Sequence, residues 1–355
     1  MLDMGWLSRL ALRAAAGVHY GAVTVGVQVS GHRLAAVRLR ALAPLPVVDA
    51  VRQYRIEPGK LGEAVRALAH GDFLAGARVA ITLGAGKYET TTIPTAPAVP
   101  EDELRDALRW QLRGALAYPP EEANFDFVRL PQAGSAGPGG GGNSGANGAI
   151  LIVSAQRREV ALALAPFYAA GIEPDALDIP EMAQRNLLGA GAGMPNCRGF
   201  LSFDDTTSLL TVQLGDDLCF ARRMQLPGAG APAEDEPEHL ADRIATNVQR
   251  SLEVFARQSS LPEVALVTVG THAHASLIAR AIREQAEVAT ALFDPAVVVA
   301  NPQVLPADPG RADGQLSMEL MLALGTALRS DGTRRAVAGA GLALPAWLQR
   351  RKETA

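Results

Sequence analysis

Residues 200–223 read FLSFDDTTSLLTVQLGDDLCFARR, three apolar runs separated by two acidic turns. Runs rich in Leu, Val, Thr and Phe that are bounded by Asp and Gly are typical of a β-meander. We expect strands over residues 200–203, 209–214 and 218–222. A long helix is predicted next, over residues 238–258, because apolar side chains recur there at spacings of three and four. The strand VALVTVG at 264–270 completes a unit of three strands, a helix and a strand.

The same order occurs earlier in the chain. The stretch AVTVGVQVSGHRLAAVRLRALAPLPVVDAVRQYRI, from residue 22, predicts three strands with a turn at Ser30 and Gly31 between the first two. Residues 60–70 predict a helix with one apolar face, and ARVAITLG at 77–84 predicts a buried strand. The sequence therefore predicts an α/β protein with a duplicated unit. Two such units facing one another are the plan of the duplicated ribonuclease H-like fold, which does not itself specify a function.

A different segment lies between the repeats. PEDELRDALRWQLRGAL at 100–116 predicts an amphipathic helix, in which Glu101, Asp102 and Glu103 are favourable charges at the N-terminus. NFDFVRL and GAILIVSA predict two strands, and the Gly/Ser-rich stretch between them is expected to be mobile because it has too little apolar surface to order itself. RREVALALAPFYAAG predicts a further helix that ends at Gly171.

These patterns divide the chain into five parts. We expect residues 1–20 to form an N-terminal amphipathic or flexible segment and residues 21–98 to form the first lobe. Residues 99–165 are expected to form a small inserted α+β domain with a Gly-rich mobile loop at 133–148. Residues 166–335 are expected to form the second lobe and the return to the first, and residues 336–355 a C-terminal tail.

Composition narrows the class of protein. The 355 residues are 48% hydrophobic, enough for a large core, and the net charge of -4 offers no basic field for nucleic-acid binding. Cys197 and Cys219 form no CxxC pair, which favours a reducing, cytoplasmic location.

No apolar run approaches the ~20 residues of a membrane span. Residues 1–20, with Arg9 and Arg13, suit either a membrane surface or a docked or frayed terminus.

Several blocks, in order, resemble the PilM family of type IV pilus assembly proteins, including its MshI-type relatives of mannose-sensitive pili. The blocks are RWQLRGALAYPPEEANFDFVRL, ILIVSAQRREVALALAPFYAAGIEPDALDIPEMAQRNLL, LSFDDTTSLLTVQLGDDLCFARRMQLPG and LMLALGTALR. The resemblance implies an actin-like, two-lobed fold with a small inserted domain. It also implies a cytoplasmic protein associated with the inner membrane, which binds the tail of a PilN-like inner-membrane protein and contacts other pilus platform proteins. Many such proteins hold ATP between the lobes.

The resemblance allows the nucleotide site to be tested residue by residue. The family's first phosphate turn is an Asp, an apolar residue, Gly and Ser, because backbone N–H groups must approach the anion and a carboxylate must hold Mg²⁺. Here Gln28 replaces the acid and Ser30 replaces the first glycine, although Gly31 follows. The carboxylate on the metal side is missing.

The other two nucleotide elements are also altered. In the second turn, Asp204 and Asp205 stand where phosphate oxygens would approach. A shifted register would instead make Asp204 the metal carboxylate, with Thr206 and Thr207 as hydroxyl donors. The third element, a Gly-rich turn after VALVTVG, keeps only Gly270 and has His272 close behind it. The degenerate nucleotide positions are therefore Ser30, Gly31, Asp204, Thr206, Thr207 and Gly270.

No other motif predicts catalysis or metal binding. Lys87 in LGAGKYE is followed by Tyr88 rather than Ser or Thr, which argues against a P-loop. GAGAGMP at 189–195 follows a helix instead of a strand, so a dinucleotide site is disfavoured. His272 and His274 have no nearby carboxylate to complete a metal shell, and no GxSxG occurs. We expect no catalytic residue and no metal site.

The leading hypothesis is thus a pilus-assembly scaffold that binds an inner-membrane partner through its first lobe. We expect it to bind no cofactor. One alternative is a protein of the same kind that binds ATP and Mg²⁺. A second alternative is the cytoplasmic component of a type II secretion platform. A transmembrane segment is expected after the actin-like part of that class, whereas AWLQRRKETA ends this sequence.

Overall fold

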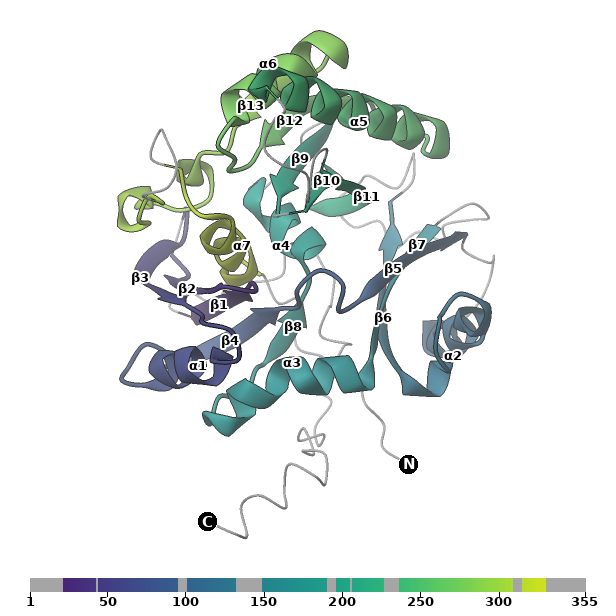
Figure 1. Cartoon of the computed structure of the whole chain (residues 1–355). Coiled ribbons are helices and arrows are strands. Elements are labelled where there is room, and N and C mark those ends of the chain that lie inside the picture. The colour runs from purple at the N-terminus through teal and green to yellow at the C-terminus, as the bar shows by residue number, and fades with distance from the viewer. Residues whose placement is uncertain are drawn as a thin grey trace.

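A computed structural model describes residues 22–42, 44–94, 101–131, 149–189, 196–204, 206–226, 236–308 and 315–329. Two five-stranded sheets form two lobes, and a three-stranded sheet lies beside them (Figure 1). The predicted N-terminal segment, the Gly-rich loop at 133–148, the C-terminal tail and Asp205 lie outside the described residues. So do the side chains of Glu101 and Asp102.

The first sheet has the order β3-β2-β1-β4-β8. Its strands are β1 (Val23–Val29), β2 (Arg33–Arg40), β3 (Val47–Arg55), β4 (Ala77–Thr82) and β8 (Ala176–Asp178). Side chains alternate between the two faces. Leu34 and Ala36 face the helices α1 (Leu61–Ala69) and α3 (Arg157–Ala169), while Ala35 and Val37 pack on the opposite side.

The second sheet repeats this plan in the order β11-β10-β9-β12-β13. Its strands are β9 (Cys197–Phe203), β10 (Thr207–Leu214), β11 (Asp217–Gln225), β12 (Val264–Val269) and β13 (Ala289–Leu292). The helices α5 (Pro237–Gln258) and α6 (Ala275–Gln285) cover one face, and the buried stripe of α5 includes Ile244, Val248 and Phe255. In both sheets the meander pairs antiparallel and the strand after the helix pairs parallel, so the predicted duplication is confirmed.

The inserted unit has its own small sheet, in the order β5-β7-β6. Its elements are β5 (Glu89–Pro94), α2 (Glu101–Gln111), β6 (Ala123–Leu130) and β7 (Ala149–Gln156). One face of the sheet packs on Leu104 and Leu108 of α2 and on Leu112 of the 3-10 turn that follows it. The other face packs on the second lobe, where Val128, Leu151 and Val153 meet Leu218 of β11. The insert therefore connects the two lobes.

Strand pairing places the boundaries of the insert differently from the predicted 98/99 and 165/166. The segment 89–94 pairs with β7 instead of joining the first lobe. The helix α3 packs on α1, and β8 pairs with β4, so residues 157–178 belong to the first lobe. Apolar periodicity predicts an element but not the sheet that it joins, and the two boundaries depend on that choice.

Two buried helices, α4 (Pro180–Leu187) and α7 (Met318–Ala327), lie between the sheets (Figure 1). A Cβ on Gly26 would lie 2.2 Å from the carbonyl oxygen of Ala323, and a Cβ on Gly325 would lie 2.2 Å from that of Ala183. Both glycines are needed for backbone approach, so α7 contacts β1 and α4 directly. Short 3-10 turns occur at Leu112–Gly114, Pro120–Glu122, Pro295–Val297 and Pro302–Val304. None of the helices in the described ranges is long and apolar enough to cross a membrane.

Candidate functional site between the lobes

The first predicted phosphate turn, between β1 and β2, is closed by its own side chain. The backbone N–H of Ser30 donates to the carbonyl of Arg33 at 2.9 Å, and the N–H of Arg33 donates back to Ser30 Oγ at 3.2 Å. Ser30 Oγ in turn donates to Glu319 Oε1 at 2.9 Å. Glu319 is buried in the first turn of α7, so an incoming anion at this turn would meet a carboxylate.

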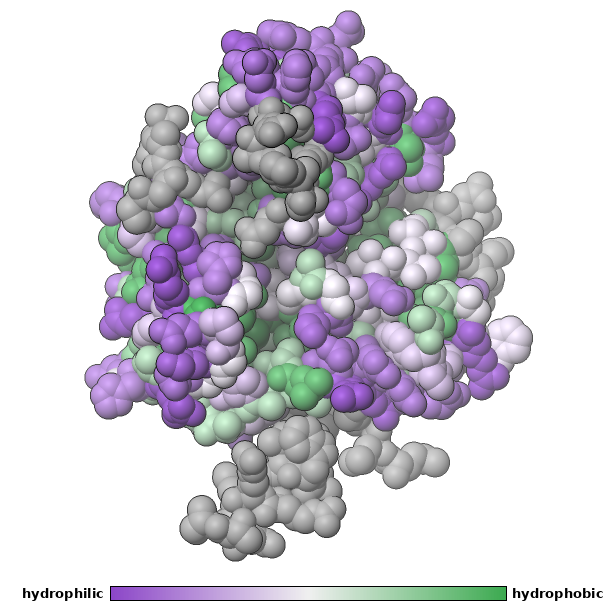
Figure 2. Space-filling model, in the orientation of Figure 1, coloured by the Kyte–Doolittle hydropathy of each residue, from purple (hydrophilic) through white to green (hydrophobic). Residues whose placement is uncertain are grey.

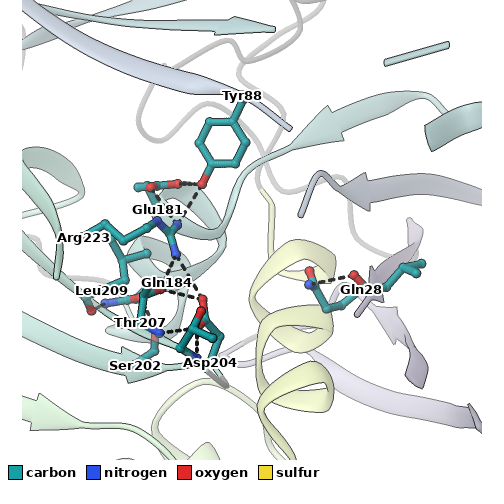
Figure 3. Close-up of polar contacts among 11 residues, drawn as sticks. Gln28, Tyr88, Glu181, Gln184, Ser202, Asp204, Thr207, Leu209 and Arg223 are labelled. Atoms are coloured by element: carbon teal, nitrogen blue, oxygen red, sulfur yellow. Dashed lines mark hydrogen bonds and ion pairs between the residues drawn. The ribbon is translucent and has the colours of Figure 1, made fainter. Parts of the chain in front are cut away.

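The other two positions of this turn do not add an anion site. A Cβ on Gly31 would meet no atom within 4 Å, so Gly31 is not needed for a close approach. Gln28 is buried beside α7, and its Nε2 donates to the carbonyl of Val29 at 3.3 Å (Figure 3). Gln28 Oε1 has no hydrogen-bond partner among the described residues. A neutral amide there supplies none of the negative charge that a metal carboxylate would.

The second predicted turn, between β9 and β10, is filled by Asp204. Asp204 Oδ1 accepts from the backbone N–H groups of Thr206 and Thr207, at 2.8 and 2.5 Å. Asp204 Oδ2 accepts from Thr207 Oγ1 at 2.6 Å. Backbone N–H groups that converge in a turn make an anion-binding concavity. Here the anion is the protein's own carboxylate, and it uses the donors that a phosphate would need.

A partly buried polar network extends from Asp204 through Arg223 (Figure 3). Arg223 Nη1 lies 3.5 Å from Asp204 Oδ2, and Nη2 lies 3.1 Å from Glu181 Oε1 on α4. The same Nη2 donates to the hydroxyl of Tyr88 at 3.0 Å, and that hydroxyl donates to Glu181 Oε2 at 2.5 Å. The network thus joins the second sheet, α4 and the residue before β5.

The chemistry of this network keeps Tyr88 neutral. Burial, followed by the nearby charge of Glu181, raises the pKa of Tyr88 well above its usual value. The hydroxyl therefore remains a hydrogen-bond donor to the carboxylate at neutral pH. Charge-assisted bonds of this kind are stronger than neutral ones.

Gln184 on α4 bonds to strands β9 and β10 close to this network. Its Nε2 donates to the carbonyls of Phe200 and Leu209, the latter at 3.0 Å, and its Oε1 accepts from Ser202 Oγ at 2.7 Å. Gln184 is fully buried. The hydroxyl of Ser202, on β9 two residues before Asp204, therefore holds α4 against the sheet.

Comparison with solved structures covers both lobes. A chain of a PilM–PilN type IV pilus biogenesis complex matches with a TM-score of 0.65 and 20% identity, over 86% of this chain and 97% of that chain. The cytoplasmic domain of EpsL, an inner-membrane component of the type II secretion system of Vibrio cholerae, has a TM-score of 0.45 and 12% identity, over 71% and 83% of the two chains. A Bacteroides thetaiotaomicron protein with an actin-like ATPase fold has a TM-score of 0.45 and 11% identity, over 82% and 98%. No protein-family model and no curated protein sequence matches the chain.

The same fold is indicated by the duplicated sheets, by the two helices between them and by the match over both lobes. The chain has the actin-like fold. The family-level resemblance stated above is thus supported at the level of the fold, as is the predicted fold class.

Gly270, the third predicted nucleotide position, has a packing role. A Cβ on Gly270 would lie 3.0 Å from the carbonyl oxygen of Leu201 and 3.2 Å from the sulfur of Met321 on α7. The ring of His272 lies 4.7 Å from that of Phe203, between centroids, and 5.7 Å from that of His274. Among the described residues no group of three or more His, Cys, Asp or Glu side chains could hold a metal ion.

The six predicted positions lie in the two turns and beside α7. Most of their hydrogen-bond donors are already bonded to other groups of the protein. Sequence reasoning did not single out Glu181, Arg223 or Glu319. One signal was present, because Glu319 is the only charged residue in the apolar run SMELMLALG. A charge inside such a run points to a buried polar contact. Nothing comparable marks Arg223, whose partners come from three separate elements.

Proposed function

We propose that this protein is a scaffold of type IV pilus assembly on the cytoplasmic side of the inner membrane, where it binds the cytoplasmic tail of a PilN-like protein. The match to a chain of a PilM–PilN complex, over 97% of that chain, supports this proposal. The resemblance of the sequence blocks to the PilM family supports it independently of the fold. Contacts with other platform proteins of the pilus, and peripheral contact with the membrane, are part of the same proposal.

The scaffold works without a bound nucleotide. The observation that supports this most is Asp204, whose carboxylate accepts the N–H groups of its own turn. A phosphate at this turn would have to displace Asp204 and would lie close to its negative charge. Like charges about 4 Å apart repel by ~1 kcal/mol in water and by several times more in a partly dry site.

The tail of the PilN-like protein needs a β-strand in or beside the first lobe with one edge unpaired. The strands β1 and β4 are paired on both sides, so neither can accept an added strand. Of the two edge strands of this sheet, β3 already bonds to the side chain of Asn301 through the N–H and C=O of Val48, and β8 has only three residues. In contrast, β5 pairs only with β7, and its residues include the exposed Thr90 and Thr92. An extended peptide binds such an edge through main-chain hydrogen bonds. We therefore assign the tail to the free edge of β5.

Titration with a synthetic peptide of the cytoplasmic tail of the PilN-like protein from the same organism tests this proposal. We expect saturable binding and slower amide hydrogen exchange in β5 when the peptide is present. A scrambled peptide of the same composition is the control. Binding with protection confined to another strand, such as β13, would move the site, and an absence of binding would remove the proposed function.

The alternative function is that of an ATP-binding actin-like protein. The hydroxyls of Thr206 and Thr207, beside Asp204, are the observation in its favour, because a carboxylate with nearby hydroxyl donors can serve Mg²⁺ and phosphate. Calorimetric titration with ATP and Mg²⁺ decides between the two. Micromolar affinity that is abolished by Asp204→Ala or Thr206→Ala would establish the alternative.

A further inference from the structure

A second polar site lies on the first lobe, away from the two turns. A pocket of about 530 Å³, open to solvent, is lined by Arg38, Arg40, Asp49, Ala50, Arg52, Asp72 and Phe73. Strand alternation places Arg38 and Arg40 on the same face as Leu34 and Ala36, which pack toward α1. The helix α7 covers the opposite face of this sheet through Ala35 and Val37. The sheet therefore separates the pocket from the interlobe region.

The arginines of the pocket are held in place before any ligand arrives. Arg38 donates to the carbonyls of Phe73 and Ala75, at 2.7 and 3.0 Å, which fixes the loop between α1 and β4. Arg40 donates to Asp49 Oδ2 through Nε and Nη2, at 3.2 and 3.0 Å. Side chains that are oriented in advance lose less entropy on binding.

Arg52 of the neighbouring strand β3 is the third arginine of the pocket. Its guanidinium lies 5.3 Å from the centroid of the Phe73 ring, and its Nη1 donates to the carbonyl of Val51 at 3.1 Å. The donors of Arg38 are used to hold the loop, but the side chain of Arg40 is 51% exposed and Arg52 is exposed. Arg40 and Arg52 can therefore offer donors to a ligand.

The charge of the region favours an anion. The lining contains three arginines and two aspartates. Residues 22–88 and 157–178 of the first lobe carry eleven Lys or Arg and eight Asp or Glu, a formal charge of +3, in a chain whose total is -4. Figure 2 shows strongly hydrophilic residues gathered over α1 and β3. The lobe thus attracts anions toward a pocket that points guanidinium groups at solvent.

We propose that this pocket binds a phosphorylated polyol such as glycerol phosphate. The planar fork of a guanidinium matches a phosphate in a bidentate manner. Arg52 retains Nε and Nη2 for such a contact and Arg40 retains Nη1, which assigns the phosphate to these two side chains. Asp49 and Asp72 would repel a bare phosphate, but carboxylate oxygens accept hydrogen bonds from hydroxyl groups. The volume also lies within the range of small-ligand sites and exceeds the needs of a single ion. The ligand could come from solution or from the headgroup of phosphatidylglycerol.

The experiment uses the full chain and two double variants of equal charge change. Arg40→Gln with Arg52→Gln removes the phosphate donors. Arg55→Gln with Arg66→Gln, at exposed positions of the same lobe outside the pocket, is the control. Circular dichroism and thermal melting establish that both variants are folded.

The first measurement is titration with sn-glycerol 3-phosphate at an ionic strength of about 0.15 M, where the Debye length is about 8 Å. The second is co-sedimentation with vesicles of phosphatidylglycerol and phosphatidylcholine in the same buffer. We expect the pocket variant to lose about tenfold or more in affinity for the probe that binds, because charged hydrogen bonds are lost. The control variant should change by less than about twofold, since distant exposed charges are screened.

Binding of the soluble probe alone would identify a free ligand, and binding of vesicles alone would identify the lipid headgroup. Either result supports the pocket, provided that the two variants differ. Equal losses in both variants would show a general electrostatic field and would overturn the proposal. An absence of binding to either probe would overturn it as well. Neither result depends on the tail peptide, so the proposed function stands or falls separately.

Discussion

At the scale of single residues, Asp204 occupies the hydrogen-bond donors of the second turn. Its carboxylate accepts two backbone N–H groups and one hydroxyl, so it acts as the anion of its own turn. Ser30 and Glu319 have a comparable relation in the first turn. The sequence predicted that both turns depart from the family's pattern. It did not predict that the departing side chains would satisfy the donors of the turns.

Replacing Asp204 with alanine should destabilise the protein by about 0.5–2 kcal/mol, because the N–H groups of Thr206 and Thr207 and the hydroxyl of Thr207 lose their acceptor. Asp106→Ala is the matched control, since the side chain of Asp106 is 83% exposed and its removal should matter by less than about 0.5 kcal/mol. Urea unfolding followed by circular dichroism measures both. Equal stability of the two variants would show that Asp204 does not organise the turn.

The Tyr88 hydroxyl predicts an alkaline dependence. Its pKa is raised above the usual value of 10.0, first by burial and then by Glu181, so the folded state holds the proton more tightly than the unfolded chain. The stabilisation is complete below pH 10 and is lost as the pH rises above that value. Tyr88→Phe should therefore be less stable than the parent at pH 8, and the gap should narrow by pH 11. Thermal melting across this range tests it, and a constant gap would contradict it.

At the scale of elements, α7 depends on glycine at its contacts. Gly325→Ala would place a Cβ 2.2 Å from the carbonyl oxygen of Ala183, and backbone cannot move aside cheaply. We expect a loss of about 3 kcal/mol or more, at the upper end of overpacking effects. Gly62→Ala in α1 is the control, because the nearest atom to its Cβ is Arg66 Nη1 at 3.5 Å. That change should be neutral or stabilise the helix by about 0.5–1 kcal/mol.

Urea unfolding of both glycine variants provides the comparison. If Gly325→Ala were as stable as Gly62→Ala, the direct contact between α7 and α4 would be wrong. The same comparison applied to Gly26→Ala tests the contact between α7 and β1.

The elements themselves were largely predictable, whereas their partners were not. Apolar runs bounded by turn residues predicted β9, β10 and β11, and helical spacing predicted α5, all to within a few residues. The pairing of β5 with β7 could not be predicted, since Glu89–Pro94 contains no feature that selects the third sheet over the first. The contacts of Arg223 likewise depend on how α4 and the insert pack.

At the scale of the whole molecule, the insert fixes the lobes relative to one another. Leu218 of β11 is fully buried against Val128, Leu151 and Val153 of the insert, and Arg223 bonds to Tyr88 in the same region. An apolar contact combined with a partly buried polar network resists rotation of one lobe against the other. The protein is therefore expected to behave as a single rigid body.

Leu218→Ala should destabilise the protein by about 2–5 kcal/mol, because it leaves a cavity between lobe and insert. It should also increase hydrogen exchange in β6 and β7, which belong to the insert. Leu162→Ala, at a position that is 50% exposed on α3, should change stability by less than about 0.5 kcal/mol. Unchanged exchange in β6 and β7 would show that the insert is held by other contacts.

The central claim is that a nucleotide-independent actin-like scaffold binds the tail of a PilN-like protein. The most direct test is calorimetric titration of the full chain with the tail peptide, once without nucleotide and once with saturating ATP and Mg²⁺. We expect binding with the same dissociation constant in both titrations. Binding that requires ATP, or no binding in either titration, would contradict it.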